Sequence, residues 1–317
     1  GLGLIGAGLL AATGPVVAVR RRPDRHWPAR RVVRWPLFVL GGLVTLSGLG
    51  VTGWAMALAG GDRSPTELTI APGIDYQRIS FDEPRRQVVH LALIDLDDPC
   101  LVLDATRPAT DGEVLAETTT EYVERTGATV AVNVAFFYPI EEYPHWDSYP
   151  TSGDPVTAIG HVVVERQRHG RTEGAWGAGL GLRNGRGWAG PTVDGAEFEV
   201  PGRNLLIVDG TSVADESESY PRTVAGVDTD TNRLVLLVAD GKQPGYAEGM
   251  TYQEVAELLL GLGVDQAVEF DGGGSSTMVA TIDGRVELLS RPSHQRIPGR
   301  ERPVATHLGV TRLDGCG

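Results

Sequence analysis

The residues best suited to chemistry lie in the glycine-rich run Asp271-Gly272-Gly273-Gly274-Ser275-Ser276-Thr277. It directly follows the apolar stretch 266–270, so we expect a strand that ends in a ligand-holding loop. Consecutive glycines allow positive φ and close approach of the backbone to a ligand, and the following hydroxyl and N–H groups can line an anion-binding concavity. The run is neither a P-loop nor a nucleophile elbow, because it lacks Gly-Lys-Ser/Thr and Gly-x-Ser-x-Gly.

Two carboxylates accompany this loop, Glu269 and Asp271. Side chains alternate along a strand, so the two should share one face with Cα atoms ~6.6 Å apart. Such a pair can act as general acid and base, or one member can act as nucleophile. A tight turn with a solvated aspartate is the structural alternative.

The elements before the loop predict how it is positioned. The strand Arg233 to Ala239 ends at Asp240, and 252–262 has the capping box, apolar face and terminal glycine of a helix. Strand, helix and strand in this order predict a βαβ crossover with parallel strands. The carboxyl ends of those strands share one side of the sheet, which would gather Asp240 with Asp271.

The rest of the domain is predicted to contain more strand than helix. The apolar and alternating stretches expected to form strands are 87–96, 100–105, 128–134, 159–165, 179–183, 204–208, 278–282, 285–289 and 304–311. A helix is expected at 113–125. We therefore predict one α+β (mixed α/β) domain with a mixed β-sheet.

A long aromatic and acidic loop follows Asn133, beginning at Phe136-Phe137 and reaching Tyr149. Loops of this length and composition often contact ligands, and sugars stack on aromatic faces. A loop that packs its own aromatic side chains over the core is the alternative.

The N-terminal 60 residues are predicted to be a membrane region, with spanning segments at 1–19 and 37–60 and an arginine-rich cytoplasmic connection at 20–34. The sequence opens on glycine, so we expect a trimmed N-terminus. A cleaved signal peptide is the rival interpretation of the second segment. A linker at 61–75 and a domain at 76–317 are expected on the extracytoplasmic side of the cell membrane.

Charge and cysteine content narrow the function classes. Residues 1–60 hold seven Arg and one Asp, which leaves 21 basic and 40 acidic residues beyond them, a net charge of about −19 that argues against nucleic-acid binding. Cys100 and Cys316 would pair in an oxidising compartment, with free buried thiols as the alternative, and we predict the disulfide. No cofactor is expected: zinc-ligand spacing is absent, and a cation between Asp240 and Asp271 has no support.

Several ordered stretches resemble the phosphodiester glycosidase family. Their order along the chain is 133–139, 221–223 with 226–228, 236–241, the capped helix, 271–278, and 301–306 with 308–310. The resemblance spans roughly 87–312 and excludes the membrane region. The chain departs from the family pattern at Val134-Ala135, where Gly-Gly is usual, and at Glu269, where Asn is frequent.

The resemblance implies hydrolysis of a sugar-1-phosphodiester or a related glycosidic bond at the cell surface. Asp271 is the first candidate for nucleophile or general base, with Asp240 or Glu269 as partner, and Arg222 and Arg302 are the candidate cations for the phosphodiester. The candidates for substrate binding are Asn133, Phe136, Phe137, Gly272, Gly273, Gly274, Ser275, Ser276, Thr277, Arg302 and His307. The alternatives are that these arginines form structural ion pairs and that His307 is a buried structural residue.

Two other functions use the same pocket. One is a non-catalytic glycan-binding or exopolysaccharide-assembly protein, which carboxylates that lie far apart or point outward would favour. The other is a hydrolase of an uncharged glycan, in which the arginines would pair with acids. The expected partners are thus a glycan or sugar-phosphate substrate and the membrane.

Overall fold

The computed structural model describes residues 61–139, 149–172, 174–215, 218–313 and 315–316. The chain divides into two units, 1–49 and 50–317, and every described residue belongs to the second. Both predicted membrane segments and their arginine-rich connection lie outside the described residues. Within the described ranges, no helix combines the length and apolar character needed to cross a membrane.

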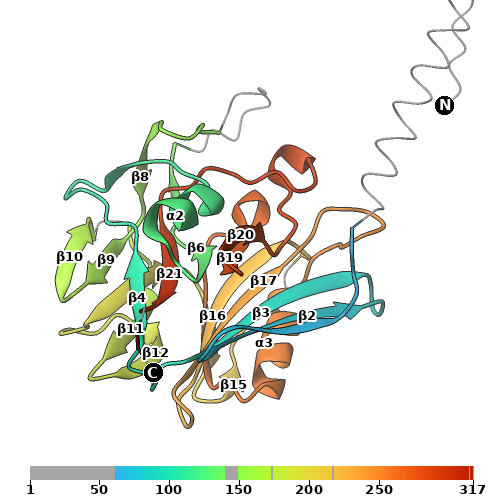
Figure 1. The fold of residues 1–317 in the computed structure, drawn as a ribbon, viewed down its shortest axis with the longest axis horizontal. Helices are drawn as coiled ribbons and strands as arrows, with labels where there is room; N and C mark the ends of the chain where they lie inside the picture. The colour runs from blue at the N-terminus through green and yellow to red at the C-terminus, as the bar shows by residue number, and fades with distance from the viewer. Residues whose placement is uncertain (1–60, 140–148, 173, 216–217, 314, 317) are drawn as a thin grey trace, which may run out of the picture. The chain divides into compact units, whose positions relative to one another are not determined.

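The largest sheet has eight strands, and every neighbouring pair in it is antiparallel (Figure 1). In spatial order its strands are β1 (Thr66–Ala71), β2 (Ile74–Phe81), β3 (Gln87–Asp95), β17 (Arg233–Ala239), β16 (Arg222–Asp228), β18 (Gln266–Glu269), β14 (Leu205–Val208) and β15 (Thr211–Ser212). This sheet carries most of the residues predicted to do chemistry.

Three smaller antiparallel sheets complete the described part of the domain. One contains β10 (Gln167–Gly170), β9 (His161–Val164), β13 (Phe198–Gly202), β11 (Ala178–Arg183) and β12 (Arg186–Pro191). A second contains β20 (Arg285–Leu288), β19 (Met278–Ile282), β6 (Val130–Asn133), β21 (His307–Arg312) and β4 (Leu101–Ala105). The third contains β5 (Glu113–Leu115), β8 (Pro155–Ala158) and β7 (Phe137–Tyr138).

Helices are few among the described residues, and capping residues define them. The helix α3 (Tyr252–Gly261) begins after the predicted capping box of Thr251 with Glu254, which is confirmed. The helix α2 (Thr119–Thr126) is shorter than the predicted helix at 113–125, because Thr118 forms its own capping box and sets a later start. One 3-10 turn, η1 (Gly273–Ser275), lies within the glycine-rich run, and a second, η2 (His294–Arg296), packs close to it.

The strands β17 and β18 run in the same direction and are joined through α3, as the predicted crossover requires. They are not neighbours, because β16 lies between them and is antiparallel to both. The strand-rich α+β prediction is therefore confirmed, whereas the mixed sheet is wrong for the described strands. A sequence pattern reveals strand direction through its connection but not the strand that inserts between.

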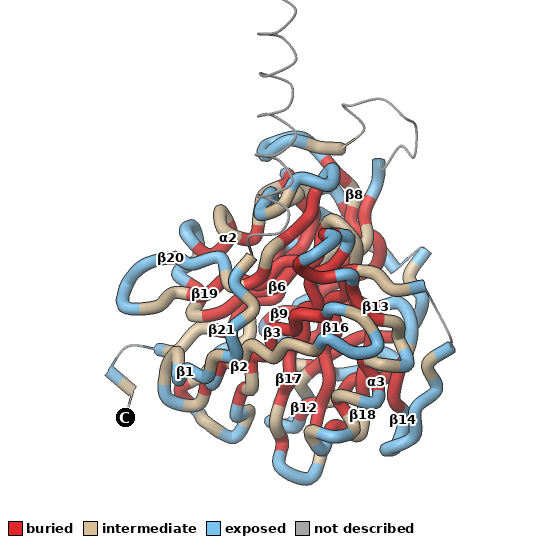
Figure 2. Tube along the Cα trace, turned by 90° about the vertical axis from the view of Figure 1, so that its right-hand side faces the viewer, coloured by how far each residue is buried: buried red, intermediate tan, exposed pale blue. Residues whose placement is uncertain are grey.

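The central strands of the eight-stranded sheet are buried on both faces, which explains the continuous apolar run of β17. Leu234, Leu236 and Val238 pack into a core shared with the smaller sheets, while Val235 and Leu237 pack against α3. Figure 2 shows these central strands buried and the connecting turns exposed. Strand ends at this sheet's edge are consequently held rigidly, which suits the positioning of a site.

The predicted linker at 61–75 is wrong in part, because Thr66–Ala71 forms strand β1 and pairs with β2. Leu68 and Ile70 alternate with polar residues, which is a strand pattern that the flanking proline and glycine obscure. The folded domain thus begins before residue 76.

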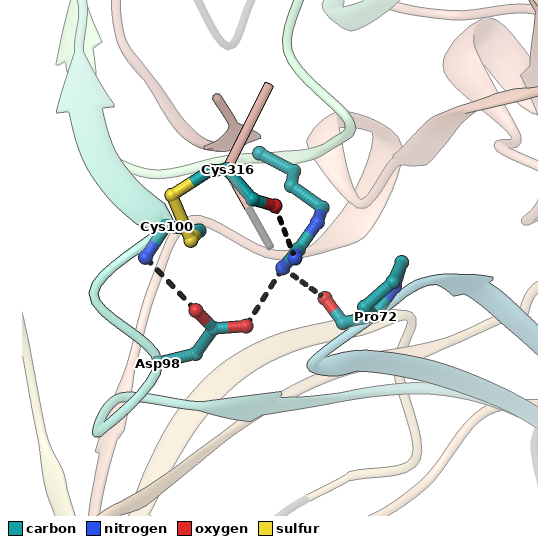
Figure 3. The surroundings of a disulfide bond; sticks show 5 residues. Pro72, Asp98, Cys100 and Cys316 are labelled. Atoms are coloured by element: carbon teal, nitrogen blue, oxygen red, sulfur yellow. Dashed lines mark hydrogen bonds and ion pairs between the residues drawn. A yellow bond between two sulfur atoms is a disulfide. The ribbon is translucent and has the colours of Figure 1, made fainter. Parts of the chain in front are cut away.

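The predicted disulfide between Cys100 and Cys316 is present, with Cα atoms 5.7 Å apart (Figure 3). Beside it, Asp98 accepts from the Cys100 N–H at 2.9 Å and from Arg312 Nη1 at 2.7 Å. Arg312 also donates to the Pro72 carbonyl at 2.9 Å and to the Cys316 carbonyl at 3.1 Å. The disulfide and Arg312 together attach the C-terminus to the β1–β2 turn and to the start of β4.

Replacing both cysteines by serine should lower the free energy of unfolding by about 2–4 kcal/mol, because the bond closes a loop of 216 residues in the unfolded chain. Denaturant unfolding with and without a reductant measures the change. Reductant should destabilise the parent to the level of the double variant and leave the variant unaffected. Equal stability of parent and variant in oxidising buffer would contradict the bond's contribution.

Candidate functional site

The candidate site lies at the end of the central strands of the eight-stranded sheet, where β16 begins and where β17 and β18 end. Arg222, the first residue of β16, pairs in register with Ala239 of β17, and Val224 pairs with Glu269 of β18. Asp240 directly follows β17 and Asp271 lies two residues after β18, and these two strands flank β16. The predicted gathering of these residues at one edge is therefore found, with Arg222 on the strand between the two aspartates.

The glycine-rich run turns sharply at η1 and brings its backbone against two neighbours. The Gly273 N–H donates to the Pro221 carbonyl at 2.9 Å, and Gly273 has φ of 63°. A Cβ at Gly274 would lie 2.5 Å from Arg302 Nη2. Glycine is needed here because any side chain would displace this guanidinium from the loop.

Asp271 is buried, and its carboxylate is only partly satisfied. Burial raises the pKa of Asp271 to about 6, while a hydrogen bond from Ser275 and the charge of Arg302 oppose that shift and the charge of Glu269 adds to it. No described residue hydrogen-bonds Asp271 Oδ2 or the buried Ser276 Oγ. A buried carboxylate with one unpartnered oxygen and a pKa near neutrality is suited to proton transfer or nucleophilic attack.

Asn133, at the end of β6, holds the backbone of this loop through side-chain hydrogen bonds. Its Nδ2 donates to the Asp271 carbonyl at 2.6 Å, and its Oδ1 accepts from Thr277 N at 3.1 Å and from Thr223 Oγ1 at 2.9 Å. The Asp271 N–H donates to the Val134 carbonyl at 2.8 Å. Asn133 therefore positions Asp271 through its main chain rather than by contact with the carboxylate.

Glu269 is the second carboxylate of the site and is held by a side chain from α3 and by one from the residue before β14. Tyr252 donates a hydrogen bond to its Oε1, and Asn204 Nδ2 donates to its Oε2 at 2.6 Å. Arg222 Nη1 lies 3.9 Å from Oε1, and the guanidinium lies 3.7 Å from the centroid of the Tyr252 ring. Glu269 is thus a fixed negative charge close enough to raise the pKa of Asp271.

Arg302 stands on the other side of the loop and is held by three contacts. Its Nη1 donates to Ser275 Oγ at 3.1 Å, its Nε donates to His294 Nδ1 at 3.2 Å, and its Cζ lies 4.3 Å from the Tyr149 ring centroid. Burial and the neighbouring arginines lower the pKa of His294 to about 4, so this imidazole stays neutral and accepts. Arg302 is accordingly an oriented cation beside Asp271.

Asp240 belongs to a separate hydrogen-bond network. His90 Nε2 lies 2.9 Å from its Oδ2, Tyr246 donates to the same oxygen at 2.8 Å, and the Arg291 N–H donates to Oδ1 at 2.8 Å. Tyr76 OH lies 2.8 Å from His90 Nδ1 and extends the network. Both carboxylate oxygens of Asp240 are therefore engaged by protein groups that do not belong to the glycine loop.

The remaining predicted binding residues differ in how far their side chains are buried. Phe136 is half-buried, whereas Phe137 is 1 % exposed and packs in the core beneath β8. His307 is fully buried, stacks on Tyr122 with centroids 4.8 Å apart and lies 3.2 Å from Thr106 Oγ1. Burial lowers the pKa of His307 to about 3, so it is a neutral interior side chain.

The described residues contain no group of three or more His, Cys, Asp or Glu side chains placed to hold a metal ion. Asp240 and Asp271, the pair considered for a cation, carry the separate partners given above. Their carboxylates therefore belong to two different hydrogen-bond networks.

Several side chains of the site were not predicted from the sequence. Tyr252 reads only as the first residue of a helix, Asn204 as the start of a strand, and His294 as part of a loop. Tyr149 does lie in the aromatic loop that predicts ligand contact, of which 140–148 falls outside the described residues. Only tertiary packing brings these residues together, and a single sequence carries no signal for that.

A hollow of about 750 Å³ is lined by segments that adjoin the site, although no residue of the glycine-rich run lines it. Tyr220 lines one wall, next to Pro221, and Gln295 and Arg296 line another, next to His294. Lys242 also borders it, with Nζ 3.6 Å from the Tyr220 ring centroid. The hollow is large enough for a sugar-sized group, and its charged lining residues are Lys242, Arg296 and Glu248.

Comparison with known proteins identifies the family to which this chain belongs. The family model of phosphodiester glycosidases matches residues 126–311. The fold is similar to the zebrafish N-acetylglucosamine-1-phosphodiester alpha-N-acetylglucosaminidase catalytic domain auto-inhibited by its pro-peptide, with a TM-score of 0.57, 18% identity, and 78% of this chain and 87% of that one covered. It is also similar to a hypothetical protein from Synechocystis, with a TM-score of 0.52, 13% identity, and coverage of 78% and 64%.

No curated protein matches the sequence at a significant level. The two structural similarities have low sequence identity and show the fold alone. The family model covers more than half of the chain and includes Asn133, Arg222, Asp271 and Arg302. The chain belongs to the phosphodiester glycosidase family.

Proposed function

We propose that the protein is a glycoside hydrolase that cleaves a sugar-1-phosphodiester, with Asp271 as general base or nucleophile. The observation that carries this proposal is the buried Asp271 carboxylate, which has a pKa near 6 and an oxygen without a partner among the described residues. The family supports a glycosidase-type reaction, and the similar zebrafish domain bears the name of a phosphodiester glycosidase.

The proposed reaction breaks the bond between the anomeric carbon and the phosphate oxygen. The oxygen of water adds to the anomeric carbon, its proton passes to Asp271, and the bonding electrons leave with a phosphomonoester. This leaving group is already a stable anion, so it needs a nearby positive charge more than a proton donor. Arg302 supplies that charge beside the loop, and the fixed charge of Glu269 stabilises the oxocarbenium-like transition state.

Glu269 is the proposed partner of Asp271 in place of Asp240. The charge of Glu269 acts directly on Asp271, while both oxygens of Asp240 are engaged by His90, Tyr246 and the Arg291 main chain. Asp240 is not among the charges that shift the pKa of Asp271, whereas Glu269 is. Asp240 is therefore proposed to support the fold of the sheet edge.

We further propose that the domain lies outside the cytoplasm, anchored to the cell membrane by segments 1–19 and 37–60, and acts on a surface glycan. Two observations support this location: the arginine-rich connection at 20–34 and the disulfide, a bond typical of oxidising compartments. Protease treatment of intact cells should digest the domain. Protection from protease in intact cells, with digestion after lysis, would contradict the orientation.

A substrate panel tests the reaction. The purified full chain is incubated with sugar-1-phosphodiesters that differ in the sugar, each beside the neutral methyl glycoside of the same sugar, and the released sugar is measured. Release from at least one phosphodiester at a higher kcat/KM than from its neutral counterpart is expected. Preference for the neutral glycosides would instead support a hydrolase of uncharged glycans, and binding without release would support the non-catalytic alternative.

The activity should depend on pH through Asp271. A base or nucleophile must be ionised, and burial raises the pKa of Asp271 to about 6. We therefore expect kcat/KM to rise about tenfold per pH unit below pH 6 and to level off above it. An activity that falls above pH 6 would show that the protonated carboxyl is the active form and would reverse the assignment to a general acid.

A further inference from the structure

Arg203, which follows strand β13, is fixed to the strand that carries the carboxylates. The Arg203 N–H donates to the Glu269 carbonyl at 2.9 Å, and the Glu269 N–H donates to the Asn204 carbonyl at 2.9 Å. A Cβ at Gly202 would lie 2.3 Å from Val268 Cγ2, so glycine is required for β13 to approach β18 this closely. The main chain of Arg203 is therefore paired with Glu269, which precedes Asp271 by two residues.

The Arg203 side chain is held by aromatic rings. Its Cζ lies 5.4 Å from the Phe136 ring centroid and 5.6 Å from that of Trp176. The two rings meet edge to face with centroids 5.2 Å apart, and Trp176 is 44 % exposed. Stacking orients a guanidinium without consuming its N–H donors, because those donors lie in the plane of the group.

The donors of Arg203 are not engaged by the part of the chain that the structure describes. None of its side-chain hydrogen bonds or ion pairs goes to a residue in the described ranges. In contrast, Arg302 donates to Ser275 and His294, and Arg222 donates to the Met250 carbonyl at 3.1 Å and the Glu218 carbonyl at 2.7 Å. Arg203 is exposed, and its side-chain donors have no partner among the described residues, unlike those of Arg222 and Arg302.

The charge of Arg203 nevertheless reaches the site. It lowers the pKa of Tyr252, the residue whose hydroxyl donates to Glu269, against the larger opposing effect of burial. An anionic substrate approaching Asp271 and Glu269 is repelled by both carboxylates and by a chain of net charge −13. A preorganised cation beside the strand that carries Glu269 would offset this repulsion.

We propose that Arg203, held against Phe136 and Trp176, binds a non-bridging phosphate oxygen of the substrate and so selects sugar phosphodiesters over neutral glycosides. The inference rests on the proposed function and adds to it a specificity residue. Arg203 binds the phosphate in the ground state and the transition state alike. Its loss therefore raises KM and leaves kcat nearly unchanged.

The test compares Arg203→Gln with the parent on the phosphodiester that the parent hydrolyses best. Loss of a charge-assisted hydrogen bond should raise KM by about 10–100-fold. Arg203→Lys should recover part of the loss, because it keeps the charge without the planar fork. Trp176→Ala, which removes one of the two rings that hold Arg203, should raise KM less than Arg203→Gln does. Arg183→Gln, at an exposed position beside the β11–β12 turn, is the matched control and should match the parent.

Salt provides a second readout that a merely structural role would not move. Raising ionic strength should increase KM of the parent relative to KM of Arg203→Gln, because salt screens the attraction to Arg203 in the parent alone and screens the repulsion by the acidic chain equally in both proteins. An unchanged KM for Arg203→Gln, or an equal salt response in both proteins, overturns the inference while hydrolysis by the parent keeps the proposed function. A parent that hydrolyses no phosphodiester overturns both.

Discussion

Asp271→Asn should lower kcat by about 10²–10⁴-fold on any substrate of the parent, because the amide can neither accept the proton of water nor attack the anomeric carbon. The two side chains have nearly the same size. The Asn133 network contacts the main chain of residue 271, so the loop should keep its conformation. Steady-state rates measured on folded protein test this expectation.

The same substitution should not reduce stability at pH 7.5. Burial raises the folded-state pKa of Asp271 to about 6 from 3.8, so the folded protein binds this proton more tightly than the unfolded chain. The contribution of this carboxyl to stability is therefore present below about pH 4 and is lost as pH rises through 6. A neutral asparagine avoids that loss, and the variant should gain up to about 3 kcal/mol relative to the parent at pH 7.5.

Asp240→Asn distinguishes the two aspartates. We expect it to destabilise the protein, because the hydrogen bonds of His90 and Tyr246 to Oδ2 depend on the carboxylate. Its folded fraction should retain far more activity than Asp271→Asn. If the folded Asp240→Asn protein were instead as inactive as Asp271→Asn, Asp240 would have to replace Glu269 as the partner.

Asn133→Ala should lower the free energy of unfolding by about 3–5 kcal/mol. The side chain satisfies the Asp271 carbonyl, the Thr277 N–H and the Thr223 hydroxyl, and all three groups are buried. Its removal leaves them without partners in a place that another side chain cannot fill. Because Thr223 belongs to β16 and Asn133 to β6, the loss also weakens the connection between two sheets.

Thr223→Val is the graded control for Asn133→Ala. It removes one hydrogen bond to Asn133 Oδ1 and leaves the other two, so it should cost about 1 kcal/mol. Denaturant unfolding of the parent and both variants at one pH gives the comparison. Equal stability of Asn133→Ala and Thr223→Val would show that Asn133 does not support the loop as described.

An element of this fold can be predicted from the sequence when the residues that specify it are close together in the chain. The capping box of Thr251 with Glu254 locates α3, and Asp283-Gly284 locates the β19–β20 turn, where the two residues have φ of 49° and 72°. Strand partners depend on residues far apart in the chain. The insertion of β16 between β17 and β18, and the pairing of Thr66–Ala71 with β2, therefore could not be predicted.

The site divides in the same way. Asp271 and the glycines could be chosen from the sequence, because consecutive glycines after a strand indicate either a close backbone approach to a ligand or a tight turn. The partners that set the properties of Asp271 and Glu269 come from separate segments: Arg302 follows η2, Tyr252 begins α3 and Arg203 follows β13. Asp240 was a reasonable candidate by position, and only its contact with His90 on β3 assigns its carboxylate elsewhere.

The position of bond cleavage tests the central claim most directly. The full chain is incubated with a sugar-1-phosphodiester in ¹⁸O-enriched water, and the phosphomonoester product is analysed by mass spectrometry. Attack at the anomeric carbon predicts a phosphomonoester without ¹⁸O, formed by the parent and at least a hundredfold more slowly by Asp271→Asn. Incorporation of ¹⁸O into the phosphomonoester would show attack at phosphorus, and it would contradict a glycosidase mechanism at Asp271.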